Sequence, residues 1–275
     1  MNIDGHIHIC DLKAKPKPEK ALGDLATAGF GGAIIISLAP PTFFIKSGKD
    51  ASNGERLENV MEWCSGTENL FPFYWIDPLE EKAMRQIEKA IDGGILGFKI
   101  ICDRFHPGDK KAMKVYRAIA ETGRPILFHS GILWDGKSSS AYNRPAEFEA
   151  LLEVQNLRFS LAHISWPWCD ELIALYGKFS NAKKIRDDVT CEMFVDTTPG
   201  TPEIYRRDAL TKLFSVGYDV RNNVFFGSDS TTESYNSKWA SEWISRDTEI
   251  LKTIGLPDGD VSNIFGGNIL KFIYS

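Results

Sequence analysis

Short apolar runs alternate along the chain with longer segments whose apolar residues recur every three or four positions. Short apolar runs bounded by Gly, Pro or Asn predict buried strands, which are expected at 3–9, 32–37, 70–76, 95–101, 125–129, 159–164, 189–195 and 224–226. The spacing of Ala112, Val115, Tyr116 and Ile119 is typical of an amphipathic helix. Helices are expected on similar grounds at 18–28, 55–64, 79–91, 109–121, 145–154, 167–178, 202–216, 238–254 and 261–273.

This order of strands and helices predicts the fold class, α/β. Strand–helix alternation favours parallel strands joined by right-handed crossovers. Repeated eight times in about 250 residues, the unit matches the size of a (β/α)8 barrel, the TIM barrel. Residues 1–275 are therefore expected to form a single domain. An open doubly wound sheet is the alternative, and the lack of a GxGxxG sequence after the first strand weighs against it.

Composition narrows the function classes. The net charge is −5, from 32 basic and 37 acidic residues, which disfavours nucleic acid as the main partner. No apolar run approaches the roughly 20 residues that span a bilayer, and the first expected strand begins too early for a signal peptide to precede it. The five cysteines form no CxxC pair, which indicates a reducing compartment. We therefore expect a cytoplasmic protein that binds neither nucleic acid nor membrane, and a homodimer stays open.

The candidate chemistry lies at strand ends. His6 and His8 are one residue apart on the first strand, and residues i and i+2 of a strand point to the same face. His129, His163 and Asp229 close the fifth, sixth and eighth apolar runs. Because a parallel barrel has its active site at the carboxyl ends of its strands, all of these side chains are expected to converge.

These residue types favour a metal site. Imidazole and carboxylate groups suit Zn²⁺ or a similar divalent ion, and no set of thiolates competes with them. A lone His-x-His pair is often incidental, but three histidines and Asp229 at equivalent strand ends are not. Such an ion lowers the pKa of a bound water from ~15.7 toward ~7 and so provides a nucleophile. A further histidine suits proton transfer at neutral pH, so the sequence predicts a metal-dependent enzyme.

Several short motifs, taken in order, resemble those of a known family. They are Asp4-x-His6-x-His8, Gly97-Phe98-Lys99, Phe128-His129-Ser130-Gly131, Leu161-Ala162-His163, Gly227-Ser228-Asp229 and the closing Asn263-Ile-Phe-Gly-Gly-Asn268. Their ordered combination resembles the amidohydrolase superfamily, in the amidohydrolase-related branch that includes aminocarboxymuconate-semialdehyde decarboxylase-like proteins. The resemblance spans the whole chain and implies a metal-dependent hydrolase on a TIM barrel.

The resemblance also implies roles for individual residues. His6, His8 and His129 match the family's metal ligands. Asp229 matches the carboxylate that binds metal and accepts a proton from the attacking water. His163 matches the acid–base or substrate-polarising histidine of members with one ion. One divalent ion, with Zn²⁺ as the first choice, is therefore expected.

Four further residues are expected to bind substrate. Lys99 ends the fourth strand, where family members with two ions carry a carboxylated lysine that bridges them. We favour an unmodified Lys99 that binds substrate, and an ordinary ion pair with Asp77 is the other interpretation. Arg104 is expected to hold a substrate carboxylate. Trp134 and Trp166 are expected to wall an apolar substrate pocket, unless they only pack against helices.

The predicted function is hydrolysis of a C–N or C–O bond in a small-molecule amide, ester or lactone. Non-oxidative decarboxylation of a small carboxylate at the same metal site is the alternative. A TatD-like nuclease is disfavoured by the acidic net charge and by Lys99, where such enzymes usually place a Glu. A catalytically silent metal-binding barrel is disfavoured by the complete ligand set.

Overall fold

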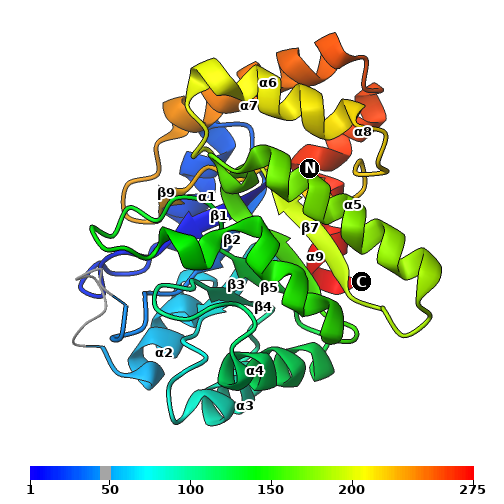
Figure 1. Ribbon diagram of the computed structural model, residues 1–275. Helices are drawn as coiled ribbons and strands as arrows, with labels where there is room; N and C mark the ends of the chain where they lie inside the picture. The colour runs from blue at the N-terminus through cyan, green and yellow to red at the C-terminus, as the bar shows by residue number, and fades with distance from the viewer. Residues whose placement is uncertain (44–50) are drawn as a thin grey trace.

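The strands form one curved, parallel sheet with helices on its outer side (Figure 1), in a computed structural model that describes residues 1–43 and 51–275. The strands are β1 (Ile3–His8), β2 (Gly32–Ile36), β3 (Leu70–Trp75), β4 (Gly97–Ile100), β5 (Ile126–Phe128), β6 (Arg158–Leu161), β7 (Glu192–Asp196), β8 (Val224–Phe225) and β9 (Ser230–Thr231). Every predicted strand is found, and its ends shift by at most three residues. The strand order is β8-β7-β6-β5-β4-β3-β2-β1-β9.

The sheet closes into a barrel through an interrupted eighth strand. Its first part, β8, pairs with β7, and its second part, β9, pairs with β1. Between the two parts, the Gly5 N–H donates to the Phe226 carbonyl at 3.0 Å and the Asp229 N–H donates to the His6 carbonyl at 2.9 Å. These bonds join the last strand position to the first, so the fold is the predicted (β/α)8 TIM barrel.

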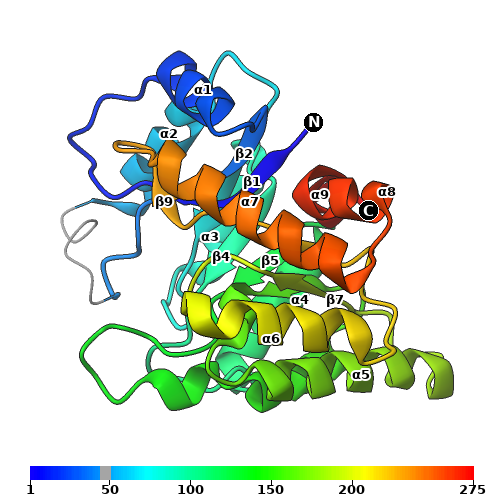
Figure 2. The same ribbon diagram turned by 90° about the horizontal axis from the view of Figure 1, so that it is seen from above.

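Helices cover the outside of the barrel (Figure 2). They are α1 (Pro18–Thr27), α2 (Asn53–Trp63), α3 (Ala83–Asp92), α4 (Lys110–Glu121), α5 (Cys169–Ile185), α6 (Glu203–Ser215), α7 (Ser237–Ile254), α8 (Asp258–Ser262) and α9 (Asn268–Tyr274). The segment expected as a helix at 145–154 is a 3₁₀ helix, Pro145–Glu153, and shorter 3₁₀ turns cover Ser140–Asn143 and Ala162–Ser165. A π-helical turn, Asn263–Gly267, joins α8 to α9.

Aromatic side chains fill the amino-terminal end of the barrel. The ring of Phe272, from α9, lies 5.1 Å from Phe194, 5.2 Å from Phe225 and 6.3 Å from Phe73, measured between ring centroids. Gly97 is required beside them, because a Cβ there would lie 2.3 Å from the Phe73 ring. This apolar plug closes one end of the barrel, so the polar inward-facing residues gather at the carboxyl ends of the strands.

Among the described residues, no helix is both long enough and apolar enough to cross a membrane.

Candidate metal centre

Three side chains bring metal-binding atoms together at the carboxyl end of the barrel. The Nε2 atoms of His6 and His8 are 3.1 Å apart, and Asp229 Oδ1 lies 3.8 Å from the first and 3.5 Å from the second. Two atoms held 2.0–2.1 Å from one Zn²⁺ at a tetrahedral angle are separated by about 3.3 Å, so this set fits a single divalent ion. Within residues 1–43 and 51–275, no other group of three His, Cys, Asp or Glu side chains gathers as closely.

The backbone of the eighth strand position aims Asp229 at the two histidines. Asp229 has a φ of 58°, in the left-handed region that non-glycine residues seldom adopt. Gly227 lets this segment approach β1, because a Cβ there would lie 2.5 Å from the His6 Cβ. The Gly227-Ser228-Asp229 motif therefore has a steric explanation. The absence of a side chain at Gly227 lets this segment lie against β1, and the turn at Asp229 directs its carboxylate toward the two histidines.

The buried Lys99 ammonium belongs to the same cluster. Its Nζ lies 3.3 Å from His6 Nε2, so the interpretation of Lys99 as an ion-pair partner of Asp77 is wrong. Burial lowers the pKa of Lys99 to about 8, while Asp196 and Asp229 act in the opposite direction. This amine can therefore lose its proton close to neutral pH.

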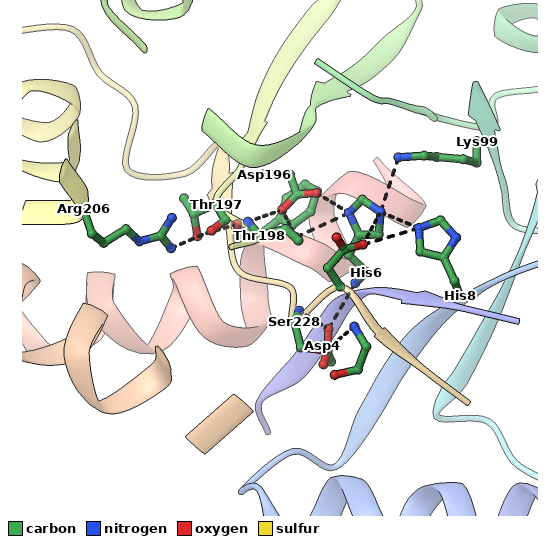
Figure 3. Close-up of polar contacts among 12 residues, drawn as sticks. Asp4, His6, His8, Lys99, Asp196, Thr197, Thr198, Arg206 and Ser228 are labelled. Atoms are coloured by element: carbon green, nitrogen blue, oxygen red, sulfur yellow. Dashed lines mark hydrogen bonds and ion pairs between the residues drawn. The ribbon is translucent and has the colours of Figure 1, made fainter. Parts of the chain in front are cut away.

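Asp196, at the end of β7, is a functional residue that the sequence analysis missed. Its Oδ2 lies 2.7 Å from His6 Nδ1, and its Oδ1 accepts hydrogen bonds from the backbone N–H (2.7 Å) and the hydroxyl of Thr198 (Figure 3). A carboxylate on Nδ1 fixes the imidazole tautomer and leaves the Nε2 lone pair for a metal ion. The signal was present, because Asp196 directly follows the apolar run of the predicted seventh strand.

Asp4 stabilises the same region through hydrogen bonds, and it is not part of the ligand group. Its Oδ1 accepts from the backbone N–H of His6 at 3.1 Å and of Ser228 at 2.8 Å, and its Oδ2 accepts from the Tyr235 hydroxyl at 2.8 Å. Burial raises the pKa of Asp4 to about 6, against the effect of these hydrogen bonds. The carboxylate ties β1 to the segment that carries Asp229.

A buried ion pair extends the polar network away from the barrel. Arg206, on α6, donates from its terminal NH₂ to the Thr197 carbonyl at 2.5 Å (Figure 3). The same guanidinium binds Asp247, on α7, through two hydrogen bonds of 2.9 and 2.5 Å. Thr197 follows Asp196 directly, so this pair fixes the backbone that presents Asp196 to His6.

His129 and His163 stand side by side next to this cluster. Their ring centroids are 5.0 Å apart, and the His163 ring is 5.5 Å from that of His6. His129 lies outside the three-residue ligand group. Its Nε2 is 3.2 Å from the Ile132 carbonyl oxygen, and an Nε2–H that donates there leaves the Nδ1 lone pair for a metal ion.

Strained backbone marks the end of β6. His163, Ile164 and Ser165 all have positive φ, of 62°, 46° and 52°. Such conformations cost about 1–3 kcal/mol each and persist only where surrounding contacts enforce them. Gly200 makes room for the His163 ring, because a Cβ there would lie 2.9 Å from the His163 Cβ. The local chain is therefore built to hold His163 in one place, and its Nδ1 is buried without a hydrogen-bond partner.

The pKa values of the four histidines in the site are shifted in a direction that favours binding of a cation. Burial lowers the pKa of His6, His8 and His129 well below the usual range, and lowers that of His163 to about 4. All four imidazoles are therefore neutral at neutral pH and keep a lone pair. Although 41% of the Asp229 side chain is exposed, desolvation by the surrounding protein raises its pKa to about 7.

The cluster forms the floor of a cavity of about 520 Å³ that opens at the mouth of the barrel. Lys99, Trp134 and Trp166 line this cavity, together with His129 and His163, in agreement with their predicted positions. All of the predicted site residues except Arg104 therefore face one space.

Arg104 is not a lining residue of the cavity. Its guanidinium binds the carboxylates of Asp77 and Asp103, the latter at 2.8 Å. The structure therefore corrects the expectation for Arg104: its hydrogen-bonding capacity is directed to two neighbouring acids and not to a substrate.

Comparison with known proteins identifies the family and supports the fold. The amidohydrolase family model matches residues 3–273, and the chain belongs to this family. An uncharacterised TIM-barrel protein from Bordetella bronchiseptica is similar in structure, with a TM-score of 0.70 at 16% identity over 98% of this chain and 97% of that one. No protein with curated annotation matches the chain.

Two further solved structures carry named activities. A 2,6-dihydroxybenzoate decarboxylase from Rhizobium matches with a TM-score of 0.64 at 12% identity over 99% of this chain and 98% of that one. A probable 2-pyrone-4,6-dicarboxylic acid hydrolase from Acinetobacter baumannii matches with a TM-score of 0.61 at 14% identity over the same shares. At these identities the likeness establishes the fold, and the reaction has to be argued from the site.

Proposed function

We propose that the protein is a metal-dependent hydrolase that cleaves a C–N or C–O bond of a small amide, ester or lactone. The observation that carries the proposal is the convergence of His6 Nε2, His8 Nε2 and Asp229 Oδ1 on the floor of an open cavity. Neutral imidazoles and one carboxylate form a donor set that suits a single divalent ion, with Zn²⁺ as the first choice.

His6, His8 and Asp229 would hold the ion, and His129 would complete the set through Nδ1. When bound, the ion supplies Lewis acidity, which polarises a carbonyl group and makes a neighbouring water more acidic. Asp196 keeps His6 in the tautomer that leaves Nε2 free. These roles follow from the donor chemistry and from the fixed orientation of each ring.

Proton transfer falls to Asp229 and His163. The Asp229 carboxylate lies in the cavity beside the other ligand atoms, and it is placed to accept a proton from the attacking water. His163 lies in the same cavity beside the His6 ring, and it is placed to polarise the scissile carbonyl or to pass a proton on to the leaving group.

Lys99 would bind the substrate beside the ion. Its Nζ lies close enough to His6 Nε2 to reach a carbonyl or carboxylate oxygen at the centre. A carboxylated Lys99 that bridges two ions is the alternative arrangement. We favour the unmodified amine, because a single group of three ligands is gathered here among the described residues.

Decarboxylation of a small carboxylate is the second candidate. It is supported by the likeness to the 2,6-dihydroxybenzoate decarboxylase and by the same set of metal-binding atoms. The engagement of Arg104 with Asp77 and Asp103 counts against it, because no arginine is found among the described residues that line the cavity.

One experiment separates these reactions. Protein stripped with a chelator and reloaded with Zn²⁺ is assayed against a panel of amides, esters and lactones, and against aromatic carboxylates with trapping of carbon dioxide. The proposal expects Zn²⁺-dependent hydrolysis and no carbon dioxide. Release of carbon dioxide without hydrolysis would show that the protein is a decarboxylase. Hydrolysis that persists after complete removal of the metal would reject the metal-dependent mechanism.

A further inference from the structure

The walls of the cavity above the metal centre are apolar on two sides. Phe43 lies in the segment after β2, and Trp75 is the last residue of β3. Their ring centroids are 4.9 Å apart. Leu133, Trp134 and Trp166 come from the segments after β5 and β6. The segments at β2 and β3 and those after β5 and β6 therefore supply two apolar walls of the same cavity.

One apolar wall reaches the candidate metal centre, and the other reaches solvent at the rim of the cavity. The Trp75 ring lies 5.6 Å from that of His8, between ring centroids, so the apolar surface begins directly beside the ligand group. Trp134 is 82% exposed at the rim, although most tryptophans are largely buried. An exposed tryptophan at the mouth of a concave apolar pocket is typical of a surface that is covered when a ligand binds.

Among the described residues that line the cavity, Lys99 is the only lysine, and none is an arginine. The acidic residues of the described lining are Asp135 and Asp229. The Nζ atom of Lys99 lies at the candidate metal centre, 3.3 Å from His6 Nε2. Asp135 is held by the Lys137 backbone N–H at 3.0 Å and by the Ser139 hydroxyl at 2.8 Å, and its carboxylate repels anions.

A carboxylate placed between these walls would lose its hydration without gaining a cation. The free-energy cost of such burial is large when no partner compensates, and an aryl or branched alkyl group has no such cost and gains by leaving water. The cavity of about 520 Å³ is within the size range of small-molecule sites.

We propose that the non-reacting part of the substrate is an uncharged apolar group of aryl size, held between the Phe43–Trp75 wall and the Leu133–Trp134–Trp166 wall. This assignment of substrate class rests on the proposed function, because the reacting bond must lie at the ion. It differs from the substrates named for the similar structures, which are a hydroxylated benzoate and a pyrone dicarboxylic acid.

The test compares two ligands of the same shape. Phenylacetamide and its para-carboxylate derivative are titrated into the Zn²⁺-loaded protein, and binding is followed by calorimetry. We expect the neutral amide to bind at least about tenfold more tightly, from the desolvation penalty of the unpaired carboxylate. Equal or tighter binding of the carboxylate derivative overturns the proposal, and so does a lack of measurable binding of the neutral amide at millimolar concentration.

Variants locate the binding surface. Trp134→Ala changes a side chain that is 82% exposed and leaves the fold intact, and it is expected to weaken binding of the neutral amide severalfold through lost apolar contact. Tyr274→Ala, at a 58% exposed aromatic residue of α9 outside the cavity lining, is the control and should leave binding unchanged. Leu133→Arg supplies the missing cation and is expected to shift the preference toward the carboxylate derivative. Equal effects of Trp134→Ala and Tyr274→Ala would overturn the assignment.

Because ligand binding and hydrolysis are measured in separate experiments, the two proposals can fail separately. A protein that binds the neutral amide through Trp134 but hydrolyses no member of the panel keeps its substrate class and loses the hydrolase assignment. A protein that hydrolyses anionic substrates in preference to neutral ones keeps the hydrolase assignment and loses the substrate class.

Discussion

The Nδ1 atom of His6 lies 2.7 Å from Oδ2 of Asp196, and both side chains are buried. The carboxylate accepts the Nδ1 proton, so Nε2 keeps its lone pair and faces His8 and Asp229. Because Asp196 is itself held by the backbone N–H and hydroxyl of Thr198, the His6 ring cannot turn without breaking this arrangement.

Asp196→Asn tests this relationship, because it preserves the shape and removes the charge. We expect the Zn²⁺ affinity of the metal-free protein to fall about 10- to 100-fold, as for other groups that orient a metal-binding histidine. Calorimetric titration measures the change. Asp77→Asn is the matched control, since Asp77 is equally buried but pairs with Arg104. An unchanged affinity in Asp196→Asn, or the same loss in both variants, would contradict the assigned role.

Arg206→Lys tests whether α6 and α7 position the centre. Lysine keeps the charge but cannot bind Asp247 with two hydrogen bonds and the Thr197 carbonyl at once. We expect weaker Zn²⁺ binding than in the unmodified protein and faster solvent exchange of the His6 Nδ1 proton, followed by NMR. Arg56→Lys is the control, because Arg56 is also fully buried and binds the Leu38 carbonyl at 3.0 Å. If both variants lose metal affinity equally, the effect is general loosening of the barrel.

The pH dependence of metal binding follows from Asp229. Its pKa is raised to about 7 in the metal-free protein, so below that pH a proton must leave before the carboxylate binds an ion. The affinity is therefore expected to fall by about tenfold for each pH unit below 7 and to depend less on pH above it. The imidazoles of His6 and His8, whose pKa values are lowered, add no proton competition in this range. A fall of clearly more than tenfold for each pH unit would instead indicate that histidines also lose protons on binding the ion.

His163→Asn separates proton transfer from metal binding. The ring lies beside His6 and outside the three-residue ligand group. We expect the variant to bind Zn²⁺ normally and to lose about 10²- to 10⁴-fold in kcat, the usual contribution of a positioned acid or base. Metal content and single-turnover rates, measured on the same sample, give both quantities. Loss of the ion with His163 would show that it is a ligand.

Most of the fold follows from local patterns in the sequence. Buried apolar runs and helical spacing predicted all eight strand positions, because a parallel barrel buries both faces of its strands. The interruption of the eighth strand was not predictable, since it depends on the positive φ of Asp229 and on the close approach of Gly227 to His6. The 3₁₀ form of Pro145–Glu153 was missed for a similar reason, because tertiary packing overrides helical spacing.

The candidate site was predictable where strand alternation alone determines direction. His6 and His8 share a face in any strand, and the barrel brings the ends of the strands together. Partners brought by other segments were not predictable: Arg104 meets Asp77, which lies 27 positions earlier in the chain, and no spacing in the sequence reveals that contact.

Metal content tests the central claim most directly. Elemental analysis of protein purified without added metal, followed by Zn²⁺ titration of the stripped protein, should give one divalent ion for each chain. Binding should be lost in folded His8→Ala and Asp229→Ala variants and kept in Asp77→Asn. Stripped, folded protein that binds no divalent ion, or the His8→Ala and Asp229→Ala variants binding it as tightly as the unmodified chain, would contradict the account.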